Sequence, residues 1–165
     1  FIAYDEIPIN NSVNVFVPFV NINNYIFDRF GAFEYKHAST ILIQNLLQKE
    51  ANAEDIKLYI NVGNDHFEIV VSDKGQLMLY NTFGYQTKED FIYFILFTVE
   101  QLQLDPETIL VKLMGDISEE DELFQIVYKY IRFVGFIEPF HNHKFSDQQK
   151  PKIHHDNYVI LNSFE

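Results

Sequence analysis

The alternation of apolar and polar residues is most regular between Lys57 and Phe83. Two runs there place an apolar side chain at every second position, and this is the period of half-buried β-strands: Leu58, Ile60, Val62 and Phe67, Ile69, Val71. The segment Asp73-Lys74-Gly75 has a glycine where a three-residue hairpin loop needs a positive φ. The pattern predicts a meander of three short strands in the middle of the chain.

The residues before the meander predict alternating strands and helices. We expect a strand over 13–17, a helix over 21–30, a strand over 32–37 and a helix over 39–48. Asn21 and Ser39 are candidate N-caps, and Gly31 stands where a helix ends in a left-handed residue. The first eleven residues show no periodicity, and the polar stretch 50–55 is predicted to join two subdomains.

The residues after the meander continue the alternation of helix and strand. We expect a helix from the capping box Thr87–Asp90, a strand over 109–114, a helix from the capping box Ser118–Asp121 and a strand over 134–140. The order from Lys57 is therefore β-β-β-α-β-α-β, preceded by β-α-β-α. This order indicates an α/β fold with a mixed sheet.

Charge and composition narrow the class of partner. The 165 residues contain 12 Lys and Arg against 24 Asp and Glu, a formal charge of −12. Such a surface repels nucleic-acid backbones, so we expect no nucleic-acid partner. No run approaches the ~20 apolar residues of a membrane span.

The absence of Cys excludes disulfides and is typical of a cytoplasmic protein. The chain begins at Phe1 without methionine, and we expect it to be a fragment of a longer protein.

Other candidate chemistry lies in three patterns of histidine, acidic and aromatic residues. The clusters His141-Asn142-His143 and His154-His155-Asp156 contain metal-binding groups, but they lie in a polar segment that predicts a surface loop, so we expect no metal site. The acidic run Glu119–Glu122 is predicted in the first turn of a helix, where carboxylates offset the helix dipole. Aromatic residues cover more than one face of both helices after the meander, which predicts core packing and a protein-contact surface.

Three segments resemble the actin-like ATPase fold of actin, Hsp70, sugar kinases and pilus-assembly and cell-division proteins. LYINVGNDHFEIVVSDKGQLMLYNTF is similar to the first hairpin of the second lobe, and ILVKLMGDISEEDELFQIV to the strand-turn-helix beside the adenosine. The helix over 39–48 resembles the one that crosses between the lobes. The stretch VFVPFVNINNYIFDRFGAFEYKHASTILI also resembles the uncharacterised DUF3822 proteins of Bacteroidetes.

The resemblance implies a division into two lobes and a ribonuclease H-like mixed sheet. Residues 1–52 would be the C-terminal part of a first lobe, and residues 53–165 the second lobe. The family's nucleotide-binding positions correspond to Asn61, Gly63, Asn64 and Asp65 in the phosphate loop, and to Gly115 and Asp116 beside the adenosine. In ATP-hydrolysing members the first loop position is a carboxylate that helps to hold magnesium. Asn61 carries no charge, so we expect a degenerate nucleotide site.

Three functions stay open at this point. The first is a non-catalytic actin-like module that acts through protein–protein contacts, without a cofactor. The alternative is an ATP-binding or ATP-hydrolysing protein whose metal carboxylate lies in an N-terminal part not present in this chain. A third is a metal protein built on the histidine loop. Asn61 separates the first two, because Asn61→Asp should strengthen magnesium-dependent ATP binding only where a site persists.

Overall fold

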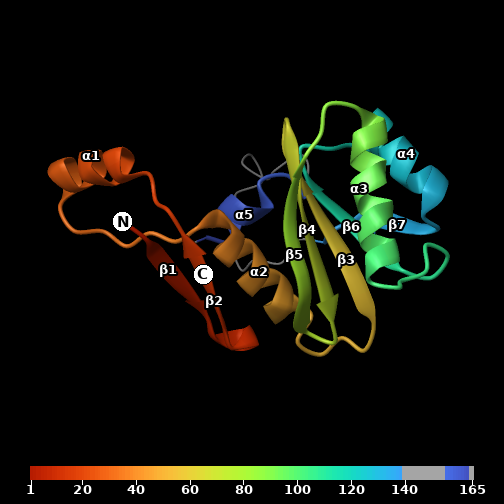
Figure 1. Cartoon of the computed structure of the whole chain (residues 1–165), viewed down its shortest axis with the longest axis horizontal. Helices are drawn as coiled ribbons and strands as arrows, with labels where there is room; N and C mark the ends of the chain where they lie inside the picture. Colours follow the sequence, from red (N-terminus) through yellow and green to blue (C-terminus); the bar gives the residue numbers. More distant parts are fainter. Residues whose placement is uncertain (139–154, 164–165) are drawn as a thin grey trace, which may run out of the picture.

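The computed structural model describes residues 1–138 and 155–163 and contains two separate sheets (Figure 1). The smaller sheet is an antiparallel hairpin of β1 (Ala3–Ile7) and β2 (Ser12–Phe16), joined by the short 3-10 helix Pro8–Asn10. Helix α1 (Val20–Phe30) follows at the end of the molecule farthest from the larger sheet. Helix α2 (Ala38–Lys49) then lies between the hairpin and the larger sheet.

The larger sheet has five strands in the order β5-β4-β3-β6-β7. Their bounds are β3 Ile56–Val62, β4 His66–Asp73, β5 Gln76–Gly84, β6 Leu110–Gly115 and β7 Phe133–Phe136. The first three form the antiparallel meander, while β6 pairs parallel with both β3 and β7. The predicted order β-β-β-α-β-α-β and the mixed sheet are therefore confirmed.

Helices cover both faces of this sheet. Helices α3 (Lys88–Gln101) and α4 (Glu122–Tyr130) pack on one face, over a core that includes Leu58 and Ile60 of β3. Helix α2 and the short helix α5 (Tyr158–Leu161) pack on the other face, over a core that includes Tyr59. Alternate residues of β3 thus enter two different cores, because successive side chains of a strand point to opposite faces.

The capping box predicted at Thr87 is present, and the turn predicted at Gly75 is one residue shorter than expected. Thr87 is the N-cap of α3, and a complete capping box joins it to Asp90. The β4–β5 turn has φ of 51° at Lys74 and 75° at Gly75. With Asp73 and Gln76 paired as strand residues, the loop has two residues and not the three expected. Two consecutive positive φ values are typical of the hairpin turn that fits the twist of the strands.

The N-terminal part contains most of the errors. Residues 32–37, expected to be a strand, form no regular element, and β1 was not predicted at all. The order before the meander is therefore β-β-α-α. Asn21 lies inside α1, whose N-cap is Phe19, and α2 is capped by the His37 side chain, which accepts from the Ser39 N–H.

The second expected capping box is also wrong. Residues 118–121 form a turn of their own, in which Asp121 Oδ2 accepts the Ser118 N–H at 2.6 Å. This carboxylate closes the turn, so α4 begins only at Glu122, and Glu119 and Glu120 precede the helix.

The aromatic residues of α3 and α4 divide between core and surface. Phe91 and Phe124 are buried, while Tyr93, Phe97 and Tyr128 are exposed. No helix of the described ranges is long and apolar enough to cross a bilayer.

We expect Thr87→Ala to lower the free energy of unfolding by about 1 kcal/mol, because it removes the side-chain acceptor for the Asp90 N–H. Thr87→Ser keeps the hydroxyl and should retain most of this stability. Urea unfolding followed by circular dichroism measures both. Equal losses in the two variants would contradict the assigned cap.

Candidate functional site

The parallel pairing of β3 and β6 brings the two predicted halves of the nucleotide site together. Val62 lies opposite Gly115 in the register, and the Asp116 N–H donates to the Val62 carbonyl at 2.9 Å. A Cβ on Gly115 would lie only 2.9 Å from Asn61 Oδ1. Residues about fifty positions apart in the sequence therefore meet where both strands end, as expected of ligand sites in α/β sheets.

The loop after β3 is a tight turn closed by hydrogen bonds within the protein. The Gly63 N–H donates to the His66 carbonyl at 2.9 Å, and the Gly63 carbonyl accepts the Tyr85 hydroxyl at 2.7 Å. The Tyr85 N–H donates to the Asp65 carbonyl at 3.1 Å. Asn64 and Asp65 point their side chains to solvent at its tip. The Gly63 N–H is thus already bonded and is not available to a phosphate.

Asn61 is held on the α2 face of the sheet by a carboxylate. Its Nδ2 donates to Glu68 Oε2 at 2.8 Å, and Tyr80 donates its hydroxyl to the other oxygen of Glu68 at 2.6 Å. Burial and the hydrogen bond to Glu68 raise the pKa of Tyr80 to about 12. At the position that the resemblance assigns to the magnesium carboxylate, this chain therefore has an amide that donates a hydrogen bond.

The mouth of the loop is acidic. A hollow of 490 Å³ beside it is lined by six residues, of which Asp65 and Asp90 are the charged ones. Burial, and then the nearby carboxylates of Asp116, Asp65 and Asp121, raise the pKa of Tyr85. His66 Nδ1 lies 2.8 Å from Asp65 Oδ1, and this hydrogen bond lowers the pKa of Asp65. In the described ranges no Lys or Arg pairs with these carboxylates, so the field disfavours a phosphate here.

His155, which the sequence pattern predicts to lie in a surface loop, packs against this end of the sheet. The His155 ring stacks on Phe136 with centroids 3.9 Å apart, and its Nε2 lies 2.7 Å from the Ile117 carbonyl. The His155 carbonyl accepts the Gly115 N–H at 3.0 Å. The imidazole and the backbone of His155 therefore pack against the side of the sheet that the resemblance predicts to face an adenosine. No local signal marks His155, because its partners lie about twenty and forty positions away.

The remaining metal candidates fall largely outside the structure. His141, His143 and His154 lie outside the described residues. Within 1–138 and 155–163, no group of three or more potential ligand residues is placed to hold a metal ion.

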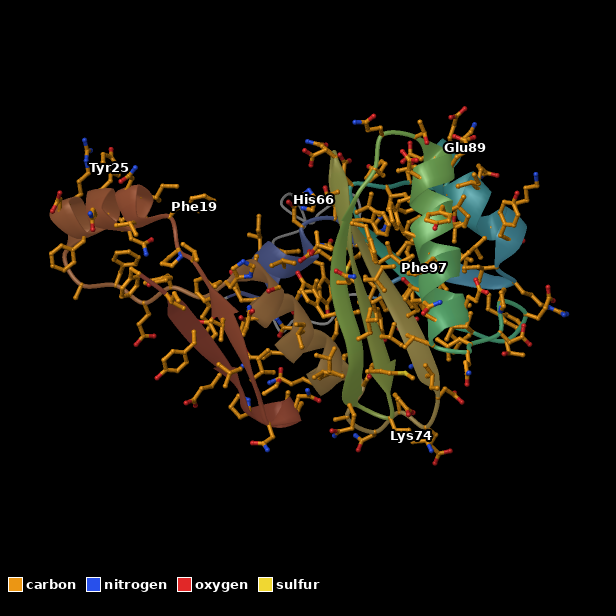
Figure 2. The ribbon with its side chains drawn as sticks, viewed as in Figure 1. Phe19, Tyr25, His66, Lys74, Glu89 and Phe97 are labelled. Atoms are coloured by element: carbon orange, nitrogen blue, oxygen red, sulfur yellow. The ribbon has the colours of Figure 1, made fainter. Side chains whose placement is uncertain are left out.

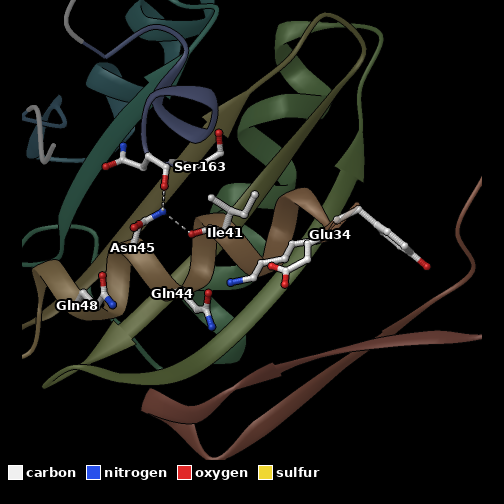
Figure 3. A pocket seen from close by; sticks show the side chains of 9 residues that line it. Glu34, Ile41, Gln44, Asn45, Gln48 and Ser163 are labelled. Atoms are coloured by element: carbon white, nitrogen blue, oxygen red, sulfur yellow. Dashed lines mark hydrogen bonds between the residues drawn. The ribbon is translucent and has the colours of Figure 1, made fainter. Parts of the chain in front are cut away.

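A second hollow lies beside α2 and contains none of the predicted site residues (Figure 3). It measures 490 Å³ and is lined partly by Gln44, Asn45 and Gln48 of the helix. Asn45 Nδ2 donates to the Ile41 carbonyl at 2.8 Å and to the Asn162 carbonyl at 3.3 Å. These bonds tie α2 to the C-terminal segment, so the amide serves the packing of the two elements.

Comparisons with known proteins agree with the resemblance. A family model described as "Protein of unknown function (DUF3822)" matches residues 1–134. A crystal structure from Bacteroides thetaiotaomicron, described as a protein with actin-like ATPase fold and unknown function, matches with a TM-score of 0.76 and 26% identity. The match covers 83% of this chain and 53% of that one, so the chain spans about half the length of the Bacteroides protein. A search of curated proteins gave no match.

We expect Gly115→Ala to destabilise the protein by about 3 kcal/mol. Gly115 has a φ of +86°, and an added Cβ would lie 2.3 Å from the Val62 carbonyl oxygen. Gly84→Ala is the control, because its Cβ would meet only Asp65 O at 3.8 Å. Chemical unfolding measures both variants. Equal stability of the two would contradict the close approach of β6 to the loop.

Proposed function

This chain belongs to the DUF3822 family of proteins of unknown function and has an actin-like ATPase fold, and from these premises we propose that it is a non-catalytic module acting through protein–protein contacts. Its nucleotide site is degenerate, and it needs no cofactor. The proposal includes a cytoplasmic location, and it excludes nucleic acid as a partner because of the charge of −12.

The observation that carries the proposal is the state of the loop after β3. Its backbone donor at Gly63 is bonded to His66 O, and Asn61 replaces the metal carboxylate and donates to Glu68. The carboxylates of Asp65, Asp116 and Asp121 place negative charge near Tyr85, which bonds to this loop. Binding a triphosphate there would require breaking the turn and overcoming like-charge repulsion, each at a cost in free energy.

We expect ATP with magnesium to leave the melting temperature of the polypeptide from the complete coding sequence unchanged. A ligand at a hundredfold its dissociation constant adds ~2.7 kcal/mol to the stability of the native state, which a melting curve resolves. Asn61→Asp should likewise gain no magnesium-dependent shift. A clear upward shift that requires magnesium would contradict the proposal and favour the ATP-dependent alternative.

The surface for protein contacts begins at the N-terminal hairpin. The face toward α2 buries Ile7, which is 3% exposed and belongs to the core that the helix covers. Polar side chains on the same face bond to the helix and its N-cap: Asp5 Oδ2 accepts from the Thr40 hydroxyl and from the His37 N–H, each at 2.7 Å. Asn14 Nδ2 donates to the Ser39 and Thr40 hydroxyls at 3.0 and 2.9 Å. These bonds fix which face points inward, because a shift by one residue would turn every side chain to the other side.

The outer face of the hairpin is exposed and carries three apolar side chains beside Glu6. Tyr4, Val13 and Val15 are 67%, 55% and 63% exposed, and Tyr4 and Val15 are directly paired across the strands. Helix α1 has no buried residue, and Figure 2 shows Phe19 and Tyr25 at the end of the molecule away from the larger sheet. An eleven-residue helix is marginal in water without packing, and contiguous apolar surface marks a contact site.

We assign this surface, the outer hairpin face with α1, to the rest of a first lobe in the same polypeptide. Residues 1–52 would then be the C-terminal part of that lobe, and residues 53–165 the second lobe. The support is the Bacteroides protein, of which 53% is matched by this chain, so that it has further chain available for such a lobe. The exposed aromatic residues of α3 and α4, Tyr93, Phe97 and Tyr128, then remain for a separate protein partner.

The absence of Cys from this chain allows a labelling test. In the polypeptide from the complete coding sequence, we expect the thiol of Val15→Cys to react at least about tenfold more slowly than that of Glu89→Cys, an exposed residue on the second lobe (Figure 2). Any native Cys elsewhere in that polypeptide is first replaced by Ser, and mass spectrometry follows the modification.

Two further outcomes decide this assignment. Reaction of both thiols at the same rate would contradict a covered hairpin face. Protection of Val15→Cys that disappears on dilution would show that a second copy covers the face, and would contradict docking within one polypeptide.

A further inference from the structure

Three of the chain's twelve Lys and Arg residues line one cavity of 450 Å³ on the α2 face of the larger sheet. The cavity is called the lysine pocket below, and its charged lining residues are Lys49, Lys57, Lys112, Glu50 and Glu138. The two glutamates offset two of the three positive charges, so the lining has a formal charge of +1 in a chain whose formal charge is −12. The lysine pocket lies near the first residues of β3 and β6, whereas the loop at Gly63 follows the last residue of β3.

The register of three strands builds the floor of the lysine pocket. Lys112 of β6 lies opposite Tyr59 of β3 on one side and opposite Gly135 of β7 on the other. Gly135 has no side chain, and a Cβ built there would lie 3.8 Å from Lys112 Nζ. The ammonium therefore lies next to the backbone of Gly135, within van der Waals distance of where a Cβ would be, and Lys112 is half-buried on the sheet surface.

The carboxylate nearest to the floor is already neutralised. Glu50 is 3% exposed, and its Oε2 lies 2.6 Å from Lys57 Nζ. Its other oxygen accepts the hydroxyl of Tyr59, a residue that is 1% exposed. Lys57 therefore balances the charge of Glu50, which forms no ion pair with Lys112.

Lys112 itself has no counter-ion in the described ranges. No hydrogen bond or ion pair joins its ammonium to any residue of 1–138 or 155–163, Glu138 included. Partial burial of an unpaired ammonium costs free energy. A bound anion would offset this cost by balancing the charge of Lys112.

We propose that the lysine pocket binds the phosphate group of a small molecule, with Lys112 as its principal charge partner. Lysine binds phosphate as a compact point charge with three donors. The cavity volume lies within the range of small-molecule sites, and Ile137 and Leu110 give it an apolar wall for the rest of the ligand. The site is independent of the nucleotide loop, which lies at the other end of β3.

Inorganic phosphate is the probe for a first experiment. Phosphate should raise the melting temperature of the unaltered chain more than chloride at equal ionic strength, and equilibrium dialysis with labelled phosphate should show one saturable site. Lys112→Met, which removes the charge and keeps the length, should weaken phosphate binding at least about tenfold. Lys74→Met is the matched control, because Lys74 is exposed in the β4–β5 turn, and it should bind like the unaltered chain.

The outcomes separate a built site from general charge screening. Without phosphate, Lys112→Met should melt at or above the temperature of the unaltered chain, since it removes an unpaired, half-buried ammonium; Lys112→Arg should keep phosphate binding. The absence of saturable binding, or equal binding by Lys112→Met and Lys74→Met, would overturn the proposal. If ATP raises the melting temperature and Lys112→Met abolishes this rise, ATP binds in the lysine pocket and not at the loop at Gly63.

Discussion

The parallel pairing of β3 with β6 is the constraint on which both ends of the larger sheet depend. At its carboxyl end the pairing sets Val62 beside Gly115, and so brings the phosphate-loop and adenosine-side positions together. Near its start the same register sets Tyr59 beside Lys112 and forms the floor of the lysine pocket. Because β3 is buried on both faces, a slip of one residue would exchange its two cores and would be strongly disfavoured.

At the carboxyl end, groups of the protein itself bond to the backbone positions that the resemblance assigns to a nucleotide site. The Tyr85 hydroxyl and the His66 carbonyl satisfy both backbone groups of Gly63, and the His155 carbonyl satisfies the Gly115 N–H. Backbone groups removed from water must be paired, and here they are paired within the protein. An actin-like ATPase fold does not by itself imply ATP chemistry, since function depends on the site and not on the fold.

At the N-terminal end, the hairpin docks on α2 through the buried side chain of Ile7 and through polar side chains. Asp5 and Asn14 make side-chain bonds to Thr40, which are directional and fix the hairpin's orientation. Tyr4, Val13 and Val15 remain on the outside, where packing against further protein would add stabilisation. This arrangement explains why α2 is well buried in this chain while α1 is not.

The sequence alone determined the elements that depend on local pattern. The period of two in the meander, the capping box at Thr87 and the apolar run over 109–114 predicted elements of the larger sheet and its helices, and the resemblance identified the family and fold. The resemblance also singled out Asn61, Gly63, Gly115 and Asp116 as site candidates, and the pairing of β3 with β6 brings these residues together. Two of the errors have a local cause. β1 has little apolar alternation to indicate a strand, and Asp121 closes a turn of its own and so does not form the predicted capping box.

Only the tertiary structure decided which distant groups meet. The contact of His155 with Gly115, the inward turn of the polar hairpin face and the unpaired Lys112 beside Gly135 have no counterpart in any short stretch of sequence. Local periodicity reports which face of one element is apolar. It carries no information on what that face packs against, because strand register and helix docking depend on contacts between residues far apart along the chain.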